Sequence, residues 1–300
     1  TILNAKQLTE AAWKLSRKAK QEALKNELFL EALSALRIER ESLSSFSLEV
    51  YKKTTENTFE EEKNIVTKYV NLIRYRQLEK IVSHTQMKFT THRNKQTASF
   101  FRKILQHPLL RNESAAFSFR AKYYFYYIKA PCYWYLGDIK KAYEYVQKLL
   151  DIFESAPIQS FKIKMYMHSL QEISMMQSSL GKLTDSMQNI RKIRDIGKLY
   201  PQFAKSIPPE YAFTHTVVME TDLYLRIPDY IKGVAQISRI EAELKKFGQA
   251  LPKHMLYGLY YNITLLYFGT GDYHKALYWI NKILNENKDD YALDLICGAR

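Results

Sequence analysis

The chain has 300 residues, of which 46% are hydrophobic and 25% are charged, and its 45 Lys and Arg against 31 Asp and Glu give a net charge of +14. This composition indicates a globular chain long enough for one or two domains or one elongated array. No apolar run approaches the roughly 20 residues of a membrane helix, and the first thirty residues lack the apolar core of a signal peptide. We therefore expect a cytoplasmic protein without a membrane span, and the two cysteines, Cys132 and Cys297, provide no disulfide framework.

The excess of positive charge favours an acidic partner, such as nucleic acid, an anionic membrane surface or an acidic peptide. The basic residues are interspersed along the chain rather than gathered in one block. A well-solvated basic surface is therefore the simpler interpretation, and an acidic partner is the alternative.

The first 66 residues are expected to form an N-terminal helical segment of their own. Residues 5–42 contain no Pro or Gly and are rich in Ala, Leu, Lys and Glu, which predicts helix. Residues 42–64 are rich in Ser, Thr and Glu and fit either a frayed helix pair or a connection. A helical repeat array is expected over residues 67–300.

A repeat of about 44 residues is visible in this second part. Gly137 and Gly181 are 44 residues apart, and Gly271 follows 90 residues later, with Pro228-Asp229 dividing that interval into 47 and 43. A small residue stands five positions after each of these turn positions: Ala142, Ser186, Gly233 and Ala276. Apolar pairs follow four and seven positions later, namely Val146 and Leu149, Ile190 and Ile193, Ile237 and Ile240, and Ile280 and Ile283. Another small residue lies seven positions before each turn position: Ala130, Ser174, Thr221 and Thr264. A fainter copy surrounds Arg93.

This pattern predicts helix–turn–helix units. Apolar residues spaced by four and seven mark one face of a helix. A Gly-Asp pair can end the first helix in a left-handed residue and cap the second helix with its carboxylate. The small residues let the two helices approach closely. We expect at least four antiparallel helix pairs between about residues 67 and 284, without a β-sheet.

The copy at residues 260–284 resembles the tetratricopeptide repeat, because Tyr267, Gly271-Asp272-Tyr273 and Ala276-Leu277 follow that family's pattern after the small Thr264. The resemblance implies an all-α fold, a right-handed α-solenoid of stacked antiparallel helix pairs, whose first helices line a concave groove.

The other copies depart from the family pattern. Lys129 and Glu220 stand where the family usually has Leu, and the period is about ten residues longer than the usual 34. HEAT and armadillo arrays, with periods of about 40–47, are the alternative by length. Residues 291–300 predict either the start of another helix pair or a capping helix.

Residues 123–135 contain eight aromatic side chains. Tyr126 and Tyr133 share a helical stripe with Ala130, and we expect this stripe to pack against the following helix. The resemblance assigns a second stripe, Tyr127 with Trp134, and a third, Tyr124 with Tyr135, to the concave groove.

The expected partner-binding face combines rings at its two ends with polar groups at its centre. Its residues are Tyr124, Tyr127, Trp134, His168, Gln171, His215, Asp222, Tyr261 and Phe268. Rings can bury an apolar anchor, and a polar centre can pair with backbone amides. The alternative is that these rings pack against the next repeat, since the chain has 23 Tyr.

No nucleotide-binding, metalloprotease or catalytic-triad signature is present. His168 and His215 could approach each other across neighbouring helices, but a metal site would need a third ligand such as Asp222. We expect no enzymatic activity, no metal and no cofactor.

The expected function is a non-enzymatic protein-interaction scaffold or peptide-sensing domain that binds a peptide or protein segment, which can be acidic, in the concave groove. The alternative is a basic helical-repeat protein that binds RNA or single-stranded DNA, with Lys and Arg on phosphates and groove rings stacked on bases. Phosphate binding weakens steeply with salt, which separates the two functions.

Overall fold

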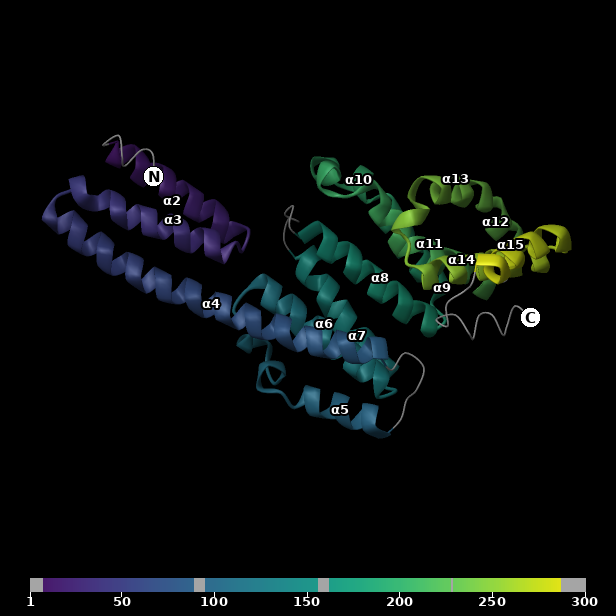
Figure 1. Cartoon of the computed structure of the whole chain (residues 1–300). Coiled ribbons are helices and arrows are strands. Elements are labelled where there is room, and N and C mark those ends of the chain that lie inside the picture. The colour runs from purple at the N-terminus through teal and green to yellow at the C-terminus, as the bar shows by residue number, and fades with distance from the viewer. Residues whose placement is uncertain (1–7, 89–94, 156–161, 228, 287–300) are drawn as a thin grey trace. The chain divides into compact units, whose positions relative to one another are not determined.

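The computed structural model describes residues 8–88, 95–155, 162–227 and 229–286, and all regular elements in these ranges are helices (Figure 1). This confirms the all-α prediction for the described residues. The chain divides into two compact units, residues 1–152 and 153–300. The expected boundary at residue 66 lies instead within a single continuous helix.

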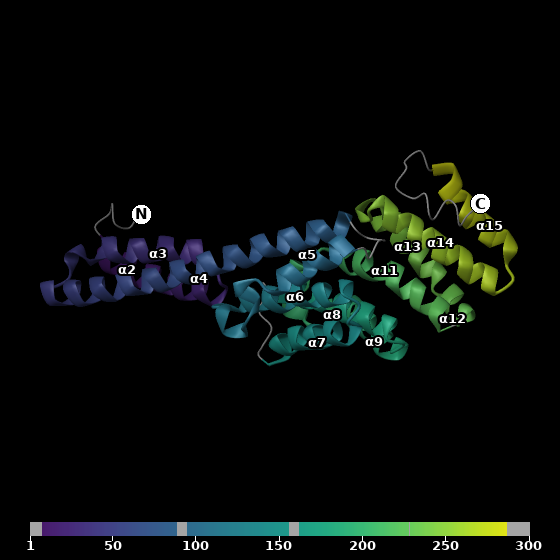
Figure 2. The same ribbon diagram turned by 90° about the horizontal axis from the view of Figure 1, so that it is seen from below.

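The first unit begins with α2 (Thr9–Lys25), α3 (Phe29–Glu41) and α4 (Leu48–Lys88), which lie side by side (Figures 1 and 2). The prediction of helix over residues 5–42 is confirmed for most of the described residues, but the chain forms two helices there, because it reverses at Glu27. This residue has φ of +52°, and the N–H of Leu28 donates to the carbonyl of Ala23 at 2.8 Å, which closes a Schellman turn. Residues 42–64 form a short 3-10 turn (Ser42–Ser45) and the start of α4 rather than a connection.

A buried lysine joins these three helices. The ammonium of Lys20 on α2 lies 2.7 Å from the carboxylate of Glu39 on α3 and 2.5 Å from that of Glu61 on α4. Lys20 and Glu39 are both buried, beside an apolar core that includes Phe29 and Leu36.

The first unit continues with α5 (Lys95–Leu105), 3-10 turns at Pro108–Leu110 and Glu113–Ala115, and α6 (Phe119–Tyr135), which packs on α4 and α5. The following α7 (Ile139–Glu154) ends two residues beyond the unit boundary. Tyr133 on α6 stacks on Tyr145 of α7, with ring centroids 5.2 Å apart, and Tyr126 lies 6.4 Å from the same ring. The prediction that Tyr126 and Tyr133 pack against the following helix is confirmed.

The second unit is built from helix pairs joined by tight turns. Its elements are α8 (Ile163–Ser179), α9 (Leu183–Arg194), α10 (Ile196–Leu199), a 3-10 turn at Pro201–Ser206, α11 (Pro209–Arg226), α12 (Tyr230–Ala235), α13 (Ile237–Phe247), a 3-10 turn at Gly248–Ala250, α14 (Lys253–Gly269) and α15 (Tyr273–Glu286). Four helix pairs correspond to the four copies of the repeat seen in the sequence. One is α6–α7 of the first unit, and the others are α8–α9, α11 with α12–α13, and α14–α15.

The turns have the predicted chemistry. Gly137, Gly181 and Gly271 have φ of +86°, +74° and +80°, a conformation that costs glycine little. Asp138 and Asp272 then accept a hydrogen bond from a backbone N–H three residues later, at 3.1 and 3.2 Å. Both parts of the Gly-Asp prediction are confirmed.

The small residues lie where helices approach closely. The hydroxyl of Ser186 on α9 donates to the carbonyl of Ser174 on α8 at 2.8 Å, and the hydroxyl of Ser174 donates back to the carbonyl of Ser186 at 3.3 Å. Ala142 and Ala276 are buried, as predicted. The turn of the fainter copy, at Arg93, and the expected helix at residues 291–300 lie outside the described residues.

Candidate functional site

The three expected groove residues of the first unit lie on α6. Tyr124 packs against the core formed by α2, α3 and α4, and burial raises the pKa of its hydroxyl. Tyr127 is half-buried and stacks on Tyr123, with centroids 5.4 Å apart and planes 13° from parallel. Trp134 is half-buried. At least Tyr124 is thus part of a packed core rather than an open platform.

The second unit brings several of the other predicted residues together on α8 and α11. The rings of His168 on α8 and His215 on α11 lie 6.0 Å apart in an edge-to-face arrangement. Tyr211, one turn before His215, stacks on its ring at 3.9 Å. We call the surface formed by His168, Gln171, Met175, His215 and Asp222 the α8–α11 face.

A small cavity of about 80 Å³ lies on this face, between Met175 and Ser178 of α8 and Asp222 and Arg226 of α11. Met175 is 40% exposed, and Asp222 pairs with Arg226 at 2.6 Å on the rim. The volume is well below the roughly 300–1,000 Å³ of small-molecule sites. The face therefore suits the contact of a chain segment better than enclosure of a small ligand.

The hydrogen bonds of His215 define its chemistry. Its Nδ1 lies 2.9 Å from the carbonyl oxygen of Tyr211. Because a carbonyl can only accept, Nδ1 carries the proton, and in the neutral ring Nε2 is an acceptor. Burial lowers the pKa of His215, against the opposing effect of the Tyr211 carbonyl, so the neutral ring is favoured.

A buried carboxyl group lies next to this pair. Glu172 on α8 is 4.0 Å from Nδ1 of His168, and burial raises the pKa of Glu172 to about 7. The Glu172 side chain is 23% exposed. The face thus carries little fixed negative charge near its centre at mildly acidic pH.

The remaining predicted residues lie on α14. This helix packs beside α11, and the side-chain amide of Asn262 donates to the Val218 carbonyl and the Thr221 hydroxyl at 3.2 and 3.1 Å. Tyr261 is half-buried against the core of the second unit. Phe268 is 60% exposed, with its ring 5.3 Å from that of Tyr273.

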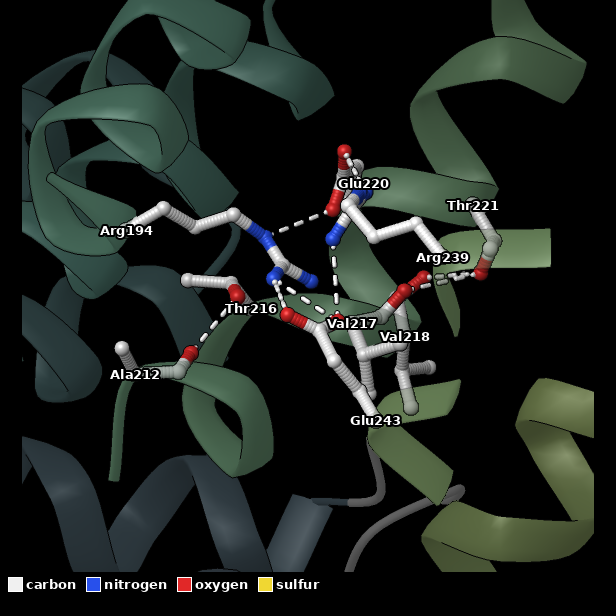
Figure 3. A network of polar contacts seen from close by, with 9 residues as sticks. All are labelled: Arg194, Ala212, Thr216, Val217, Val218, Glu220, Thr221, Arg239 and Glu243. Carbon is white, nitrogen blue, oxygen red and sulfur yellow. Dashed lines mark hydrogen bonds and ion pairs between the residues drawn. The ribbon is translucent and has the colours of Figure 1, made fainter. Parts of the chain in front are cut away.

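The opposite side of α11 is fixed by a network of four charged side chains (Figure 3). The guanidinium of Arg194 on α9 pairs with Glu220 of α11 at 2.8 Å and with Glu243 of α13 at 2.9 Å. Arg239 on α13 pairs with the same two carboxylates, at 2.7 and 2.9 Å. The two positive and two negative charges balance, and the four ion pairs join α11 to α9 and α13.

A second surface was not anticipated from the repeat pattern. It is a groove of about 530 Å³ in the first unit, lined by α4, α5 and the turn at Pro108–Leu110. We call it the α4–α5 groove. One signal in the sequence could have pointed to it, since residues 63–112 contain eleven Lys and Arg and only one acidic residue, Glu79. The basic residues remain interspersed in this stretch, but the acidic residues that balance them elsewhere in the chain are almost absent from it.

Neither surface has the donor set of a metal centre. Among the described residues, no three His, Cys, Asp or Glu side chains are grouped to hold a metal ion. Cys132 is buried, and burial raises the pKa of its thiol to about 12, which disfavours the reactive thiolate. In the described ranges, no helix combines the length and the apolar character that crossing a membrane requires.

Comparison with protein-family models finds no match to this chain, and comparison with curated proteins finds none either.

Proposed function

We propose that this chain is a non-enzymatic interaction protein whose second unit binds a segment of a partner protein along α8, α11 and α14. The observation that carries the proposal is the α8–α11 face, where adjacent helices join a polar centre of two histidines to an exposed methionine. In the proposed arrangement, the helix pairs stack as a right-handed α-solenoid of the tetratricopeptide kind, and the first helix of each pair lines the binding groove.

The chemistry of the face supports a peptide ligand. Neutral His215 offers an acceptor for a backbone N–H, and Asp222 with Arg226 offers charged partners at the rim. Met175 is a flexible apolar contact suited to varied side chains, and Phe268 adds an exposed ring on α14. These groups can hold an extended or helical segment without enclosing it.

A peptide-display selection against the full chain tests this proposal. Peptides of about twelve residues that bind the wild type should bind Met175→Glu at least tenfold more weakly, because the charge would be desolvated at the contact. Leu199→Glu is the matched control, since Leu199 is an exposed residue of the same unit, on α10. Its binding should equal that of the wild type.

Two outcomes would overturn the proposal. One is equal affinity of the wild type and Met175→Glu for every selected peptide. The other is binding only to single-stranded RNA or DNA with a steep loss of affinity between low and high salt, which would assign the chain to nucleic-acid binding.

A further inference from the structure

The α4–α5 groove combines an apolar floor with basic edges. Leu78, Ile81, Ile104 and Leu109 supply the apolar lining, and Arg74 lies at its margin. The hydroxyl of buried Tyr75 donates to the carbonyl of Leu109 at 2.6 Å, which fixes the turn at Pro108–Leu110 against α4. This hydrogen bond joins two of the elements that line the groove, α4 and the turn.

An exposed apolar stripe extends the groove along α4. Val66, Val70 and Ile73 are each 41% exposed, and Ile81 is 45% exposed. Their spacing of four, three and eight residues places them on one side of the helix. Fifteen residues at about 1.5 Å each give a stripe of roughly 22 Å, the length of four helical turns.

The charge around this stripe has one sign. Arg74, Arg76 and Lys80 on α4 and Arg102 and Lys103 on α5 are exposed. The single acidic residue of the stretch, Glu79, is buried. Lys80 lies 3.5 Å from the Glu79 carboxylate, and residues 63–112 contain no other acidic residue that could balance the positive edges.

His107 adds a directed donor to the groove. The backbone N–H of Leu109 donates to Nδ1 of His107 at 3.2 Å, so Nδ1 has no proton. The proton of the neutral ring is then on Nε2, which can donate to a carboxylate.

We propose that the α4–α5 groove and its stripe bind an acidic amphipathic helix of a partner protein. A helix of about four turns matches the stripe in length and presents apolar anchors at intervals of three, four and seven residues. Its Glu and Asp side chains meet the basic edges, which raises the association rate and disfavours basic partners. This surface belongs to the first unit alone and is independent of the proposed α8–α11 ligand.

The apolar lining disfavours the competing occupants. Single-stranded nucleic acid is usually held by rings that stack on its bases, whereas the only aromatic ring among the residues that line the groove is the imidazole of His107, and the others are five apolar residues with Arg74 and Gln77. A second copy of this chain is disfavoured because the basic edges of two copies would repel each other. The acidic cluster of Glu60, Glu61 and Glu62 on α4 is already engaged, with these carboxylates on Lys63, Lys20 and Arg40 respectively.

The test uses two display libraries of sixteen-residue helices with the same randomised apolar face. One library has Glu and Asp on the polar face, and the other has Lys and Arg. The full chain should enrich the acidic library, and the selected helices should bind Ile81→Glu and Arg74→Glu at least tenfold more weakly than wild type. Leu30→Glu and Arg37→Glu are matched controls on α3, where both side chains are exposed. They should retain wild-type affinity.

Several results would overturn the proposal. These are enrichment of neither library, equal enrichment of both, or selected helices that bind Ile81→Glu as tightly as wild type. Self-association that Ile81→Glu abolishes would assign the groove to a second copy. A further contrary result is a wild type that binds none of the helices but binds single-stranded RNA or anionic vesicles. If Arg74→Glu loses that binding, the groove belongs to nucleic acid or to a membrane surface instead. Circular dichroism of each variant checks that the helices remain folded.

Discussion

Glu27 combines a backbone conformation that is unusual for a side chain of its size with a long-range capping role. Its φ of +52° is disfavoured by about 1–2 kcal/mol for residues other than glycine. Its carboxylate accepts hydrogen bonds from the backbone N–H groups of Phe119 and Arg120, at 2.5 and 2.9 Å, at the first turn of α6. A carboxylate at this position is favoured by both hydrogen bonding and the helix dipole. The capping interaction offsets the backbone cost.

Two substitutions at Glu27 separate these effects. Glu27→Ala should lower the free energy of unfolding by about 1–2 kcal/mol, because the cap is lost while the left-handed residue remains. Glu27→Gly also loses the cap but relieves the backbone, so it should be about 1 kcal/mol more stable than Glu27→Ala. Urea unfolding of both variants measures the difference. Equal stability would show that the left-handed turn imposes no cost here.

The Glu172 carboxyl should make stability depend on pH. Its pKa is raised from 4.5 in the unfolded chain to about 7 in the folded chain. The folded chain therefore holds more protons between these values, and stability falls as pH rises through this window. Glu172→Gln should remove this pH-dependent loss. The unfolding free energy of the variant, relative to that of wild type, should therefore rise by up to about 3 kcal/mol between pH 4.5 and 7. The lowered pKa of His215 makes stability rise with pH, which is opposite to the effect of Glu172. This effect is the same in wild type and variant, so it cancels when their unfolding free energies are subtracted. A constant difference in unfolding free energy across this range would contradict the assignment.

At the scale of helices, charged residues in core positions are stabilised by partners that include side chains of other helices. Glu220 is buried on α11 because Arg194 and Arg239 come from α9 and α13. Lys129 is buried on α6, where its ammonium lies 4.4 Å from the ring of Phe125 and 4.9 Å from that of Tyr145. Such contacts of a cation with ring faces stabilise it where water is excluded.

Removing one charge from the four-residue network should be costly. Glu220→Gln leaves the two arginines with one carboxylate, so we expect a loss of about 3 kcal/mol or more in the free energy of unfolding. Glu41→Gln is the control, because the Arg37–Glu41 pair is exposed and should contribute less than about 1 kcal/mol. Thermal and urea unfolding of both variants provide the comparison. Similar small losses would mean that solvent screens the network as it does a surface pair.

The helix pairs were predictable where local chemistry determines them. Glycines at left-handed turns, aspartate caps and small residues at helix crossings all act within a few residues, so the spacing alone locates them. The reversal at Glu27 was not predictable, because nothing in the local composition marks Glu as a left-handed residue. Lys129 and Glu220 looked like departures from a repeat pattern because Tyr145, Arg194 and Arg239, which contact them, lie in other helices. For the site, the sequence placed His168 and His215 on adjacent helices, but it gave no sign that Tyr124 packs against α2–α4.

At the scale of the molecule, each unit has an apolar core of its own. In the first unit, Phe29, Leu36 and Leu72 pack between α2, α3 and α4. In the second unit, Val217 and Ile263 belong to the core shared by α11, α13, α14 and α15. In helical arrays, stability is approximately the sum of terms within each repeat and terms between neighbours. A local loss of stability should therefore remain largely within the unit that carries it.

Hydrogen exchange of the two destabilised variants tests this independence. Glu27→Ala should speed exchange of the protected amides of α2, α3 and α6, and leave those of α11, α14 and α15 at wild-type rates. Glu220→Gln should speed exchange in α11, α14 and α15 and leave α2, α3 and α6 at wild-type rates, because the network that it weakens joins α9, α11 and α13. The physical reason is that amides exchange through opening of the cooperative unit to which they belong. Mass spectrometry of peptides from the intact chain gives both rates in one experiment, with wild type as reference. A uniform increase along the whole chain in either variant would show instead that the two units unfold as one.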